Sequence, residues 1–282
     1  MVLVYGLLTA LMWTNSNLCS ARSVRYIPQF SVVAWVTLVG LIITIPFAVV
    51  GGVPAGLTAA AIAGLSLAGI GVVVGLVCLY GAFRVGKVSV VSPIASAEGA
   101  VAAILAGVFG EPIGMARAAM LVIIVVGVVL SAFAPDPVPV EHEQPIKAAL
   151  LAFGAACSLG LGIYLTGRFS SDLPLAWVLM VPRIAGCLVL FVPLLITRRL
   201  RLTRSAVPLV TATGMSEVLG YFFLGLGARL SIAITAVLAS QVATFTVLGG
   251  RILFGERLGR WQVLGIVIVI SGVTGLALVG AH

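Results

Sequence analysis

Three ionisable residues, Glu98, Arg183 and Glu217, stand inside long apolar stretches of the sequence, and a fourth, Arg251, lies near the end of one. A charge at the centre of a bilayer costs roughly 2.5 to 3.5 kcal/mol on insertion scales, so such residues are expected to serve a function. A carboxylate removed from water there would bind a proton near neutral pH. Glu98 is therefore a candidate for ion coupling, the alternative being a structural carboxylate paired with Arg183 or bonded to a hydroxyl.

Polar residues recur at helical spacing in the first apolar stretch. Thr9, Trp13, Ser16, Asn17 and Ser20 share one face of a helix, and that face must point into a bundle because lipid offers no hydrogen bonds. Trp13 could contact the apolar part of a ligand, and Asn17 could bond its polar end. Helix packing through polar contacts is the alternative for Ser16 and Ser20.

A second polar face surrounds Glu217. Thr213 and Tyr221 lie four residues before and after it, so the three side chains share one side of a helix. This face could line a cavity, or Glu217 could tie its helix to Arg183. Gln241 is predicted to line the same cavity from a later helix.

The amino-acid composition indicates that these residues lie within a membrane and not in a soluble domain. The chain has 282 residues, of which 61% are hydrophobic and 9% charged, whereas soluble domains carry about a quarter charged residues. The net charge of +8 comes from basic residues in separate loops, without the basic stripe of a nucleic-acid-binding surface. The sequence therefore predicts an all-α integral membrane protein.

About ten spans of roughly 20 residues fit this length. The predicted spans are 2–20, 29–50, 57–83, 88–109, 113–134, 148–168, 174–197, 206–228, 231–253 and 260–280. A linker rich in proline and charge, residues 135–147, separates a first unit (1–134) from a second (148–282).

The two units are related by a repeat. A shift of 145 positions superposes Phe109-Gly110-Glu111 on Phe254-Gly255-Glu256, Gly114 on Gly259, and Gly127 on Gly272. Five spans per repeat place equivalent ends on opposite sides of the membrane, so the repeats are predicted to be inverted. Inverted repeats are typical of secondary transporters, whose binding site lies where the repeats meet.

The repeat also suggests hinges and a topology. Gly86 and Ser231 align at the junctions before the fourth and ninth spans and are hinge candidates. Eleven Lys and Arg residues fall in loops on one side and three on the other, so the positive-inside rule predicts both termini outside. Glu111 and Glu256 follow glycines at helix ends, where each is expected to cap the next helix.

Several stretches resemble a known family. The segment 82–94 running to Phe109-Gly110-Glu111, and its second copy from Gly227 to Gly259, are similar to the helix signatures of the EamA family in the drug/metabolite transporter superfamily. Trp13-Thr14-Asn15-Ser16-Asn17 and Pro182-Arg183 also resemble family stretches, although Thr14 stands where glycine is usual.

The resemblance implies ten helices, alternating access, and export or exchange of small metabolites such as amino acids, related amphipathic compounds or drug-like molecules. Proton coupling is conceivable through the buried carboxylates. The expected location is the cell membrane, with a small-molecule substrate and no metal or cofactor, as monomer or homodimer. The alternatives are a flippase-like protein for lipid carriers, an assembly subunit and, with less support, a membrane enzyme.

Overall fold

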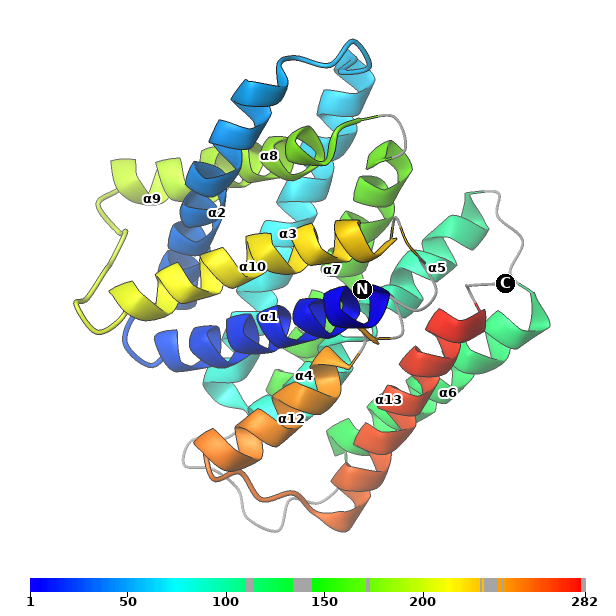
Figure 1. Ribbon diagram of the computed structural model, residues 1–282. Coiled ribbons are helices and arrows are strands. Elements are labelled where there is room, and N and C mark those ends of the chain that lie inside the picture. Colours follow the sequence, from blue (N-terminus) through cyan, green and yellow to red (C-terminus); the bar gives the residue numbers. More distant parts are fainter. Residues whose placement is uncertain are drawn as a thin grey trace.

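The computed structural model describes residues 1–109, 114–133, 144–170, 173–228, 230, 238–239 and 241–279, and within them the regular structure is helical (Figure 1). The first half contains α1 (Val2–Ser23), α2 (Gln29–Gly51), α3 (Ala59–Val85), α4 (Val88–Ala95), α5 (Glu98–Val108) and α6 (Met115–Phe133). The second half contains α7 (Pro145–Ser170), α8 (Leu175–Gly186), a π-helical turn (Cys187–Phe191), α9 (Val192–Ile196), α10 (Val207–Ala228), α12 (Val242–Leu253) and α13 (Arg260–Val279).

Length and apolar composition separate these helices into two groups. Within the described residues, six helices are long and apolar enough to cross a membrane: α1, α2, α3, α7, the run from α8 to α9, and α10. Four further apolar helical stretches are shorter, and they belong to α4 with α5, α6, α12 and α13. Large apolar side chains such as Phe47 and Val50 are exposed on the outside, as lipid-facing residues of a membrane protein are expected to be.

The span expected over 88–109 is largely helical, with a turn at Ser96 and Ala97 that divides it into two helices. α4 ends at Ala95, and α5 begins at Glu98. The Ser96 hydroxyl donates to the carbonyl of Pro93 over 2.7 Å, which satisfies one carbonyl at the break. Gly160 of α7 leaves room for the backbone of Glu98 to approach. The break therefore places Glu98 in the first turn of a new helix.

Two other expected boundaries shift. α7 begins at Pro145, so the proposed linker gives way to helix before residue 147, and residues 134–143 lie outside the described ranges. The span expected over 174–197 is helical, but a π-helical turn interrupts it four residues after Arg183. A π turn adds one residue to a helical turn and is frequent near functional sites.

Helices of the two halves pack in pairs. α1 runs antiparallel to α10, because Tyr5 stacks near Phe223 while Ser16 contacts Glu217. α3 likewise runs antiparallel to α7, since Gly64 meets Phe169 near one end and Gly81 approaches Leu151 near the other. These pairs bring helices from far apart in the sequence into the centre of the bundle, as Figure 1 shows for α1 and α10.

The contacts between the halves are reciprocal when α7 is equated with α1, α8 with α2, and α10 with α3. The contact of α1 with α10 then corresponds to that of α7 with α3, and α2 with α10 corresponds to α8 with α3. α6 and α13 lie side by side (Figure 1), and their aligned glycines behave alike. Gly127 packs against Val269, and Gly272 packs against Ile124.

Two tryptophans bind backbone carbonyls at opposite ends of the bundle. The indole N–H of Trp35, near the start of α2, donates to the carbonyl of Arg201 over 3.1 Å. The indole N–H of Trp177, near the start of α8, donates to the carbonyl of Gly52 just past the end of α2, over 2.8 Å. Tryptophan is enriched at both membrane–water interfaces, where its ring is half in apolar surroundings and its N–H finds a partner.

Glu256 joins the two halves at one end of the bundle. Its carboxylate accepts the backbone N–H groups of Val88 and Ser89, each over 2.8 Å, and so caps the start of α4. Lys87, only 1% exposed, donates to the carbonyl of Arg257 over 2.8 Å. The expectation that Glu256 caps the following helix is therefore wrong, because it caps a helix of the first half instead. Its counterpart Glu111 lies outside the described residues.

Candidate functional site

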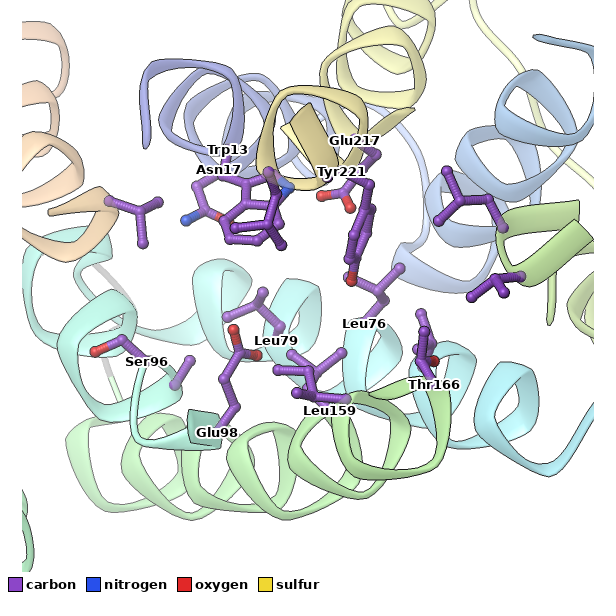
Figure 2. A pocket seen from close by; sticks show the side chains of 18 of the residues that line it. Trp13, Asn17, Leu76, Leu79, Ser96, Glu98, Leu159, Thr166, Glu217 and Tyr221 are labelled. Carbon is purple, nitrogen blue, oxygen red and sulfur yellow. The ribbon is translucent and has the colours of Figure 1, made fainter. Parts of the chain in front are cut away.

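A cavity of about 530 Å³ lies between helices of the two halves. Most of its wall is aliphatic, with Leu76, Leu79 and Leu159 among the lining side chains. Its polar and aromatic lining residues include Trp13, Asn17, Ser92, Ser96, Glu98, Thr166, Glu217 and Tyr221. Figure 2 shows the side chains of Glu98 and Glu217 on opposite sides of this space. The volume and the mostly apolar lining are those of a small-molecule site.

The two halves contribute polar and aromatic side chains to the cavity from different helices. Trp13, Asn17 and Glu98 come from α1 and α5 of the first half, and Glu217 and Tyr221 come from α10 of the second. The structure thus brings five of the predicted site residues to one cavity, although more than 200 positions separate Trp13 from Tyr221 in the sequence. Buried polar faces on α1 and α10 were the signal for this convergence, and the antiparallel packing of the two helices produces it.

Glu217 is held from α1. The hydroxyl of Ser16 donates to its Oε1 over 2.6 Å. The preceding residue of each helix forms a second bond, in which Asn15 Nδ2 donates to the hydroxyl of Ser216 over 2.8 Å. Thr213, one turn earlier, is fully buried and returns its hydroxyl to the carbonyl of Leu209. The polar face of α10 therefore packs against α1, and Glu217 meets the cavity at the edge of that contact.

The surroundings of the Glu98 carboxylate differ from those of Glu217. Within the described part of the chain its carboxylate has neither a hydrogen bond nor an ion pair, and Glu217 is the charged group that acts on it. The two structural alternatives, pairing with Arg183 or bonding to a neighbouring hydroxyl, are therefore not what the structure contains. The Glu98 side chain points from the start of α5 into the cavity (Figure 2).

Trp13 and Tyr221 form an aromatic wall. Their ring centroids lie 5.2 Å apart with an interplanar angle of 72°, an edge-to-face arrangement. Gly220 of α10 makes room for the Trp13 indole, since a Cβ at that position would collide with Trp13 Nε1. Asn17, one turn further along α1, reaches Thr246 Oγ1 of α12 over 3.4 Å. α1 therefore contacts both α10 and α12 around the cavity.

Arg183 lies behind this wall and not on it. Its guanidinium donates to the carbonyl of Leu179 over 2.8 Å and lies 5.9 Å from the ring centroid of Tyr221. It lines a smaller adjoining pocket of about 60 Å³ together with Glu217 and Tyr221. The Arg183 charge acts on Glu217, but no ion pair within 4 Å joins these two described residues, so the alternative of a Glu217–Arg183 tie is not what the structure contains.

The remaining candidates are Gln241 and the two predicted hinge residues. Gln241 is not among its lining residues: Nε2 donates to Thr274 on α13 over 3.2 Å, and Oε1 accepts from Thr244 over 3.2 Å. The expectation that Gln241 lines the cavity is therefore wrong. Gly86 has extended backbone and packs closely against Ala148 of α7, and its partner in the repeat, Ser231, lies outside the described residues.

Tyr80 is a buried polar residue beside the site that the sequence pattern did not reveal. Its side chain is fully buried on α3 near Ser16 and Ser20, within electrostatic reach of Glu217. Its hydroxyl makes no well-formed hydrogen bond in the described structure. A tyrosine among aliphatic neighbours looks like a core residue in sequence, so only the fold places it next to the Ser16–Glu217 pair.

The comparisons with known proteins agree with this architecture. The family model described as the EamA-like transporter family matches residues 1–133 and again residues 146–278. The chain belongs to the EamA-like transporter family. The two matches cover both halves, as expected for a protein built from two repeats, and the family consists of membrane transporters of small molecules.

Beyond the family model, this protein is similar to solved structures. No curated protein matches the sequence of this EamA-like transporter. A solved crystal structure, titled as the crystal structure of a protein, is similar over 99% of this chain and 97% of its own, with a TM-score of 0.68 and 14% sequence identity. At that identity the similarity concerns the fold alone, and it extends over nearly the whole of both chains.

Proposed function

We propose that this EamA-like protein is a secondary active transporter that exports or exchanges a small amphipathic metabolite by alternating access. The observation that carries the proposal is the interior cavity of about 530 Å³, whose polar lining comes from both repeats. A lipid-carrier flippase or an assembly subunit would not need such a cavity. Its size and its mixture of aliphatic, aromatic and acidic side chains suit amino-acid derivatives, amines and drug-like molecules.

The architecture of the proposal is ten spans in two inverted five-helix repeats. One observation supports it: the contacts between the halves are reciprocal. Two similar bundles of opposite orientation can give inward-open and outward-open states of comparable energy. Movement of one bundle against the other then exposes the cavity alternately to each side.

The state described here is closed at the end where Glu256 caps α4. The cavity lining extends instead toward Pro174 and Gly225, at the opposite end of the bundle. Because the loops on the Glu256 side hold most of the lysines and arginines, that side is proposed to be cytoplasmic, with both termini outside the cell membrane. The structure would then be outward-facing, and Gly86 and Ser231 remain the proposed hinges.

The coupling ion is proposed to be a proton that binds to a cavity carboxylate. Glu98 faces Glu217 and Tyr221 across the cavity, and Arg183 lies behind that pair. Two acidic groups that share one mostly apolar space cannot easily both be charged without a counter-ion. Binding of a proton or of a cationic substrate would relieve this repulsion, which gives the two ligands a reason to compete.

The experiment is flux in proteoliposomes with Glu98→Gln and Glu217→Gln. Both substitutions keep the shape of the side chain and remove the charge, and both are expected to reduce transport of substrate while the protein stays folded. Glu141→Gln, which removes one charge from the sequence between the two family matches, is the matched control and should transport normally. Wild-type flux in both cavity variants would remove these carboxylates from the mechanism.

A further inference from the structure

We infer that the transported substrate is a small amphipathic organic cation, an amine or quaternary ammonium attached to an aromatic or apolar body, and that Glu98 is its counter-ion. This inference rests on the proposed transport function and names the substrate class for it. Four features carry it: the charges that line the cavity, the different surroundings of its two carboxylates, the aromatic wall, and the position of Arg183.

The ionisable side chains that line the cavity are acidic or phenolic. Glu98, Glu217 and Tyr221 face it, and among the described residues no lysine, arginine or histidine contributes to its lining. An anionic substrate would bring a further negative charge into a mostly aliphatic space with no cation to pair with it, which is strongly unfavourable. A cation would neutralise a charge that is already there.

The two carboxylates are not equivalent. Glu217 already accepts a hydrogen bond from Ser16 over 2.6 Å and lies within the field of Arg183. Glu98 has no such partner in the described structure, and its side chain extends into open cavity space (Figure 2). The fold therefore satisfies one acid internally and leaves the other available, so Glu98 binds the cation and Glu217 positions the aromatic wall beside it.

That wall suits a cation with an apolar body. Trp13 and Tyr221 meet edge to face 5.2 Å apart, and both rings line the cavity opposite the side from which Glu98 enters (Figure 2). A ring face attracts an ammonium group within about 6 Å of its centroid, and tryptophan does so best. Leu76, Leu79 and Leu159 supply the surface for the hydrocarbon part of the substrate.

A zwitterion is the nearest competitor, because its carboxylate would need a cation. Arg183 is the cation that acts on Glu217, but its guanidinium donates to the carbonyl of Leu179 and lies 5.9 Å from the ring centroid of Tyr221. It lines the small pocket of about 60 Å³ rather than the large cavity. The geometry thus favours a substrate with one positive group and no negative group.

A charge series with one hydrocarbon body tests this directly. The probes are 2-phenylethylamine, its permanently charged trimethylammonium analogue, 2-phenylethanol, phenylacetate and phenylalanine, each added to purified protein at pH 7 in a thermal-shift and competition assay. A ligand that binds the folded state raises its thermal midpoint. We expect the two cations to stabilise the protein and to bind more than about tenfold tighter than the neutral and anionic members.

Substitutions then assign the charge to one side chain. Glu98→Gln should abolish the preference for the cations, and Glu98→Asp, which keeps the charge on a shorter side chain, should retain the preference with weaker binding. Glu141→Gln serves as the control and should bind like the wild type. If Glu98→Gln does not fold, the Glu98→Asp result and the ranking of the five probes on the wild type still decide the question.

The outcomes separate this inference from the transport function. Tighter binding of phenylacetate or phenylalanine, a preference for cations that survives Glu98→Gln, or stabilisation by neither cation overturns the inference. Flux of a zwitterion through Glu98→Gln at the wild-type rate would also overturn it while leaving transport established. Conversely, binding of cations that depends on Glu98, without flux in proteoliposomes, would contradict the transport function and leave the binding site standing.

Discussion

Ser16 donates its hydroxyl to Glu217 over 2.6 Å, and this bond joins α1 of the first repeat to α10 of the second. Ser16 is fully buried, so its hydroxyl has no access to bulk water. The bond holds the Glu217 carboxylate close to the aromatic wall formed by Trp13 and Tyr221. It also explains how an acid can be kept in the interior without a direct ion pair to Arg183.

Ser16→Ala is expected to lower both stability and transport. The loss should lie between about 0.6 kcal/mol, the mean for polar contacts between membrane helices, and about 3 kcal/mol, the cost of an unsatisfied buried acceptor. Thermal unfolding in detergent measures it. The double variant Ser16→Ala/Glu217→Gln should lose less than the sum of the single variants, because the two residues share one interaction.

The control for that cycle is Ser20→Ala, one turn along the same helix. The Ser20 hydroxyl donates to the carbonyl of Asn17 on its own helix, so its removal leaves the contact between α1 and α10 intact. Additive losses in the double variant at Ser16 and Glu217 would contradict the coupling.

Gly40→Ala should reduce transport although it raises helix propensity. A Cβ at this position of α2 would lie 2.5 Å from Arg183 Nε, so the guanidinium must move from its place behind Tyr221. Alanine in a helix interior otherwise adds up to about 1 kcal/mol of stability relative to glycine. Flux and thermal midpoint, measured together, separate the two effects.

Gly51→Ala is the matched control on α2, because a Cβ there meets no atom within 4 Å. It should leave transport unchanged. If Gly40→Ala transports at the wild-type rate, the position of Arg183 behind the wall has no role in the mechanism.

Gly220→Ala should disturb the aromatic wall from the α10 side. Its new methyl group would collide with Trp13 Nε1 and push the indole out of its edge-to-face contact with Tyr221. Substrate binding should weaken by about tenfold or more, since an aromatic pair is worth about 0.5 to 1.5 kcal/mol and a cation on a ring about as much again. Tryptophan fluorescence and ligand titration report the two changes.

The comparison variant is Gly114→Ala, whose new Cβ would meet nothing within 4 Å. A normal binding constant in Gly220→Ala would show that the ring position is irrelevant to the ligand.

Glu256→Ala should destabilise the closed end of the transporter. It leaves the N–H groups of Val88 and Ser89 without their acceptors, and loss of a helix cap costs about 0.5 to 2 kcal/mol. Glu256→Gln retains one acceptor oxygen and should fall between the alanine variant and the wild type. Thermal unfolding ranks the three, and accessibility of a cysteine introduced at Ser89 reports whether this end opens. An unchanged accessibility in Glu256→Ala would mean that the cap does not hold it closed.

Much of the cavity could be predicted because a membrane interior leaves few places for polar groups. Glu98, Glu217 and the faces containing Asn17 and Tyr221 stand out against apolar neighbours, and the lack of hydrogen-bonding solvent forces them inward. Gln241 satisfied the same criterion but faces Thr274 of α13. Periodicity in the sequence identifies a polar face of a helix. The rotation of the helix about its axis then determines whether that face lines the cavity or contacts a neighbouring helix.

The helix break and the Glu256 cap could not be predicted for a different reason. The stretch around Ser96 contains Pro93, which favours a kink, but the sequence does not show the close packing of the Glu98 backbone against Gly160 of α7. Glu256 lies 168 positions from Val88, so no local pattern connects them. Both features come from contacts between the repeats, which only the folded arrangement specifies.

The indole bonds at Trp35 of α2 and at Gly52 just past its end have a consequence for the surrounding lipid. From Trp35 to Gly52 the chain advances 17 residues, which at about 1.5 Å per residue is about 25 Å of helix. If the two indoles mark the two interfaces, we expect the matching bilayer core to be thinner than the typical value of about 30 Å. A thicker membrane would have to compress around the protein or tilt its helices, at a cost that rises with each ångström of mismatch. We therefore expect transport to depend on the acyl-chain length of the surrounding lipid.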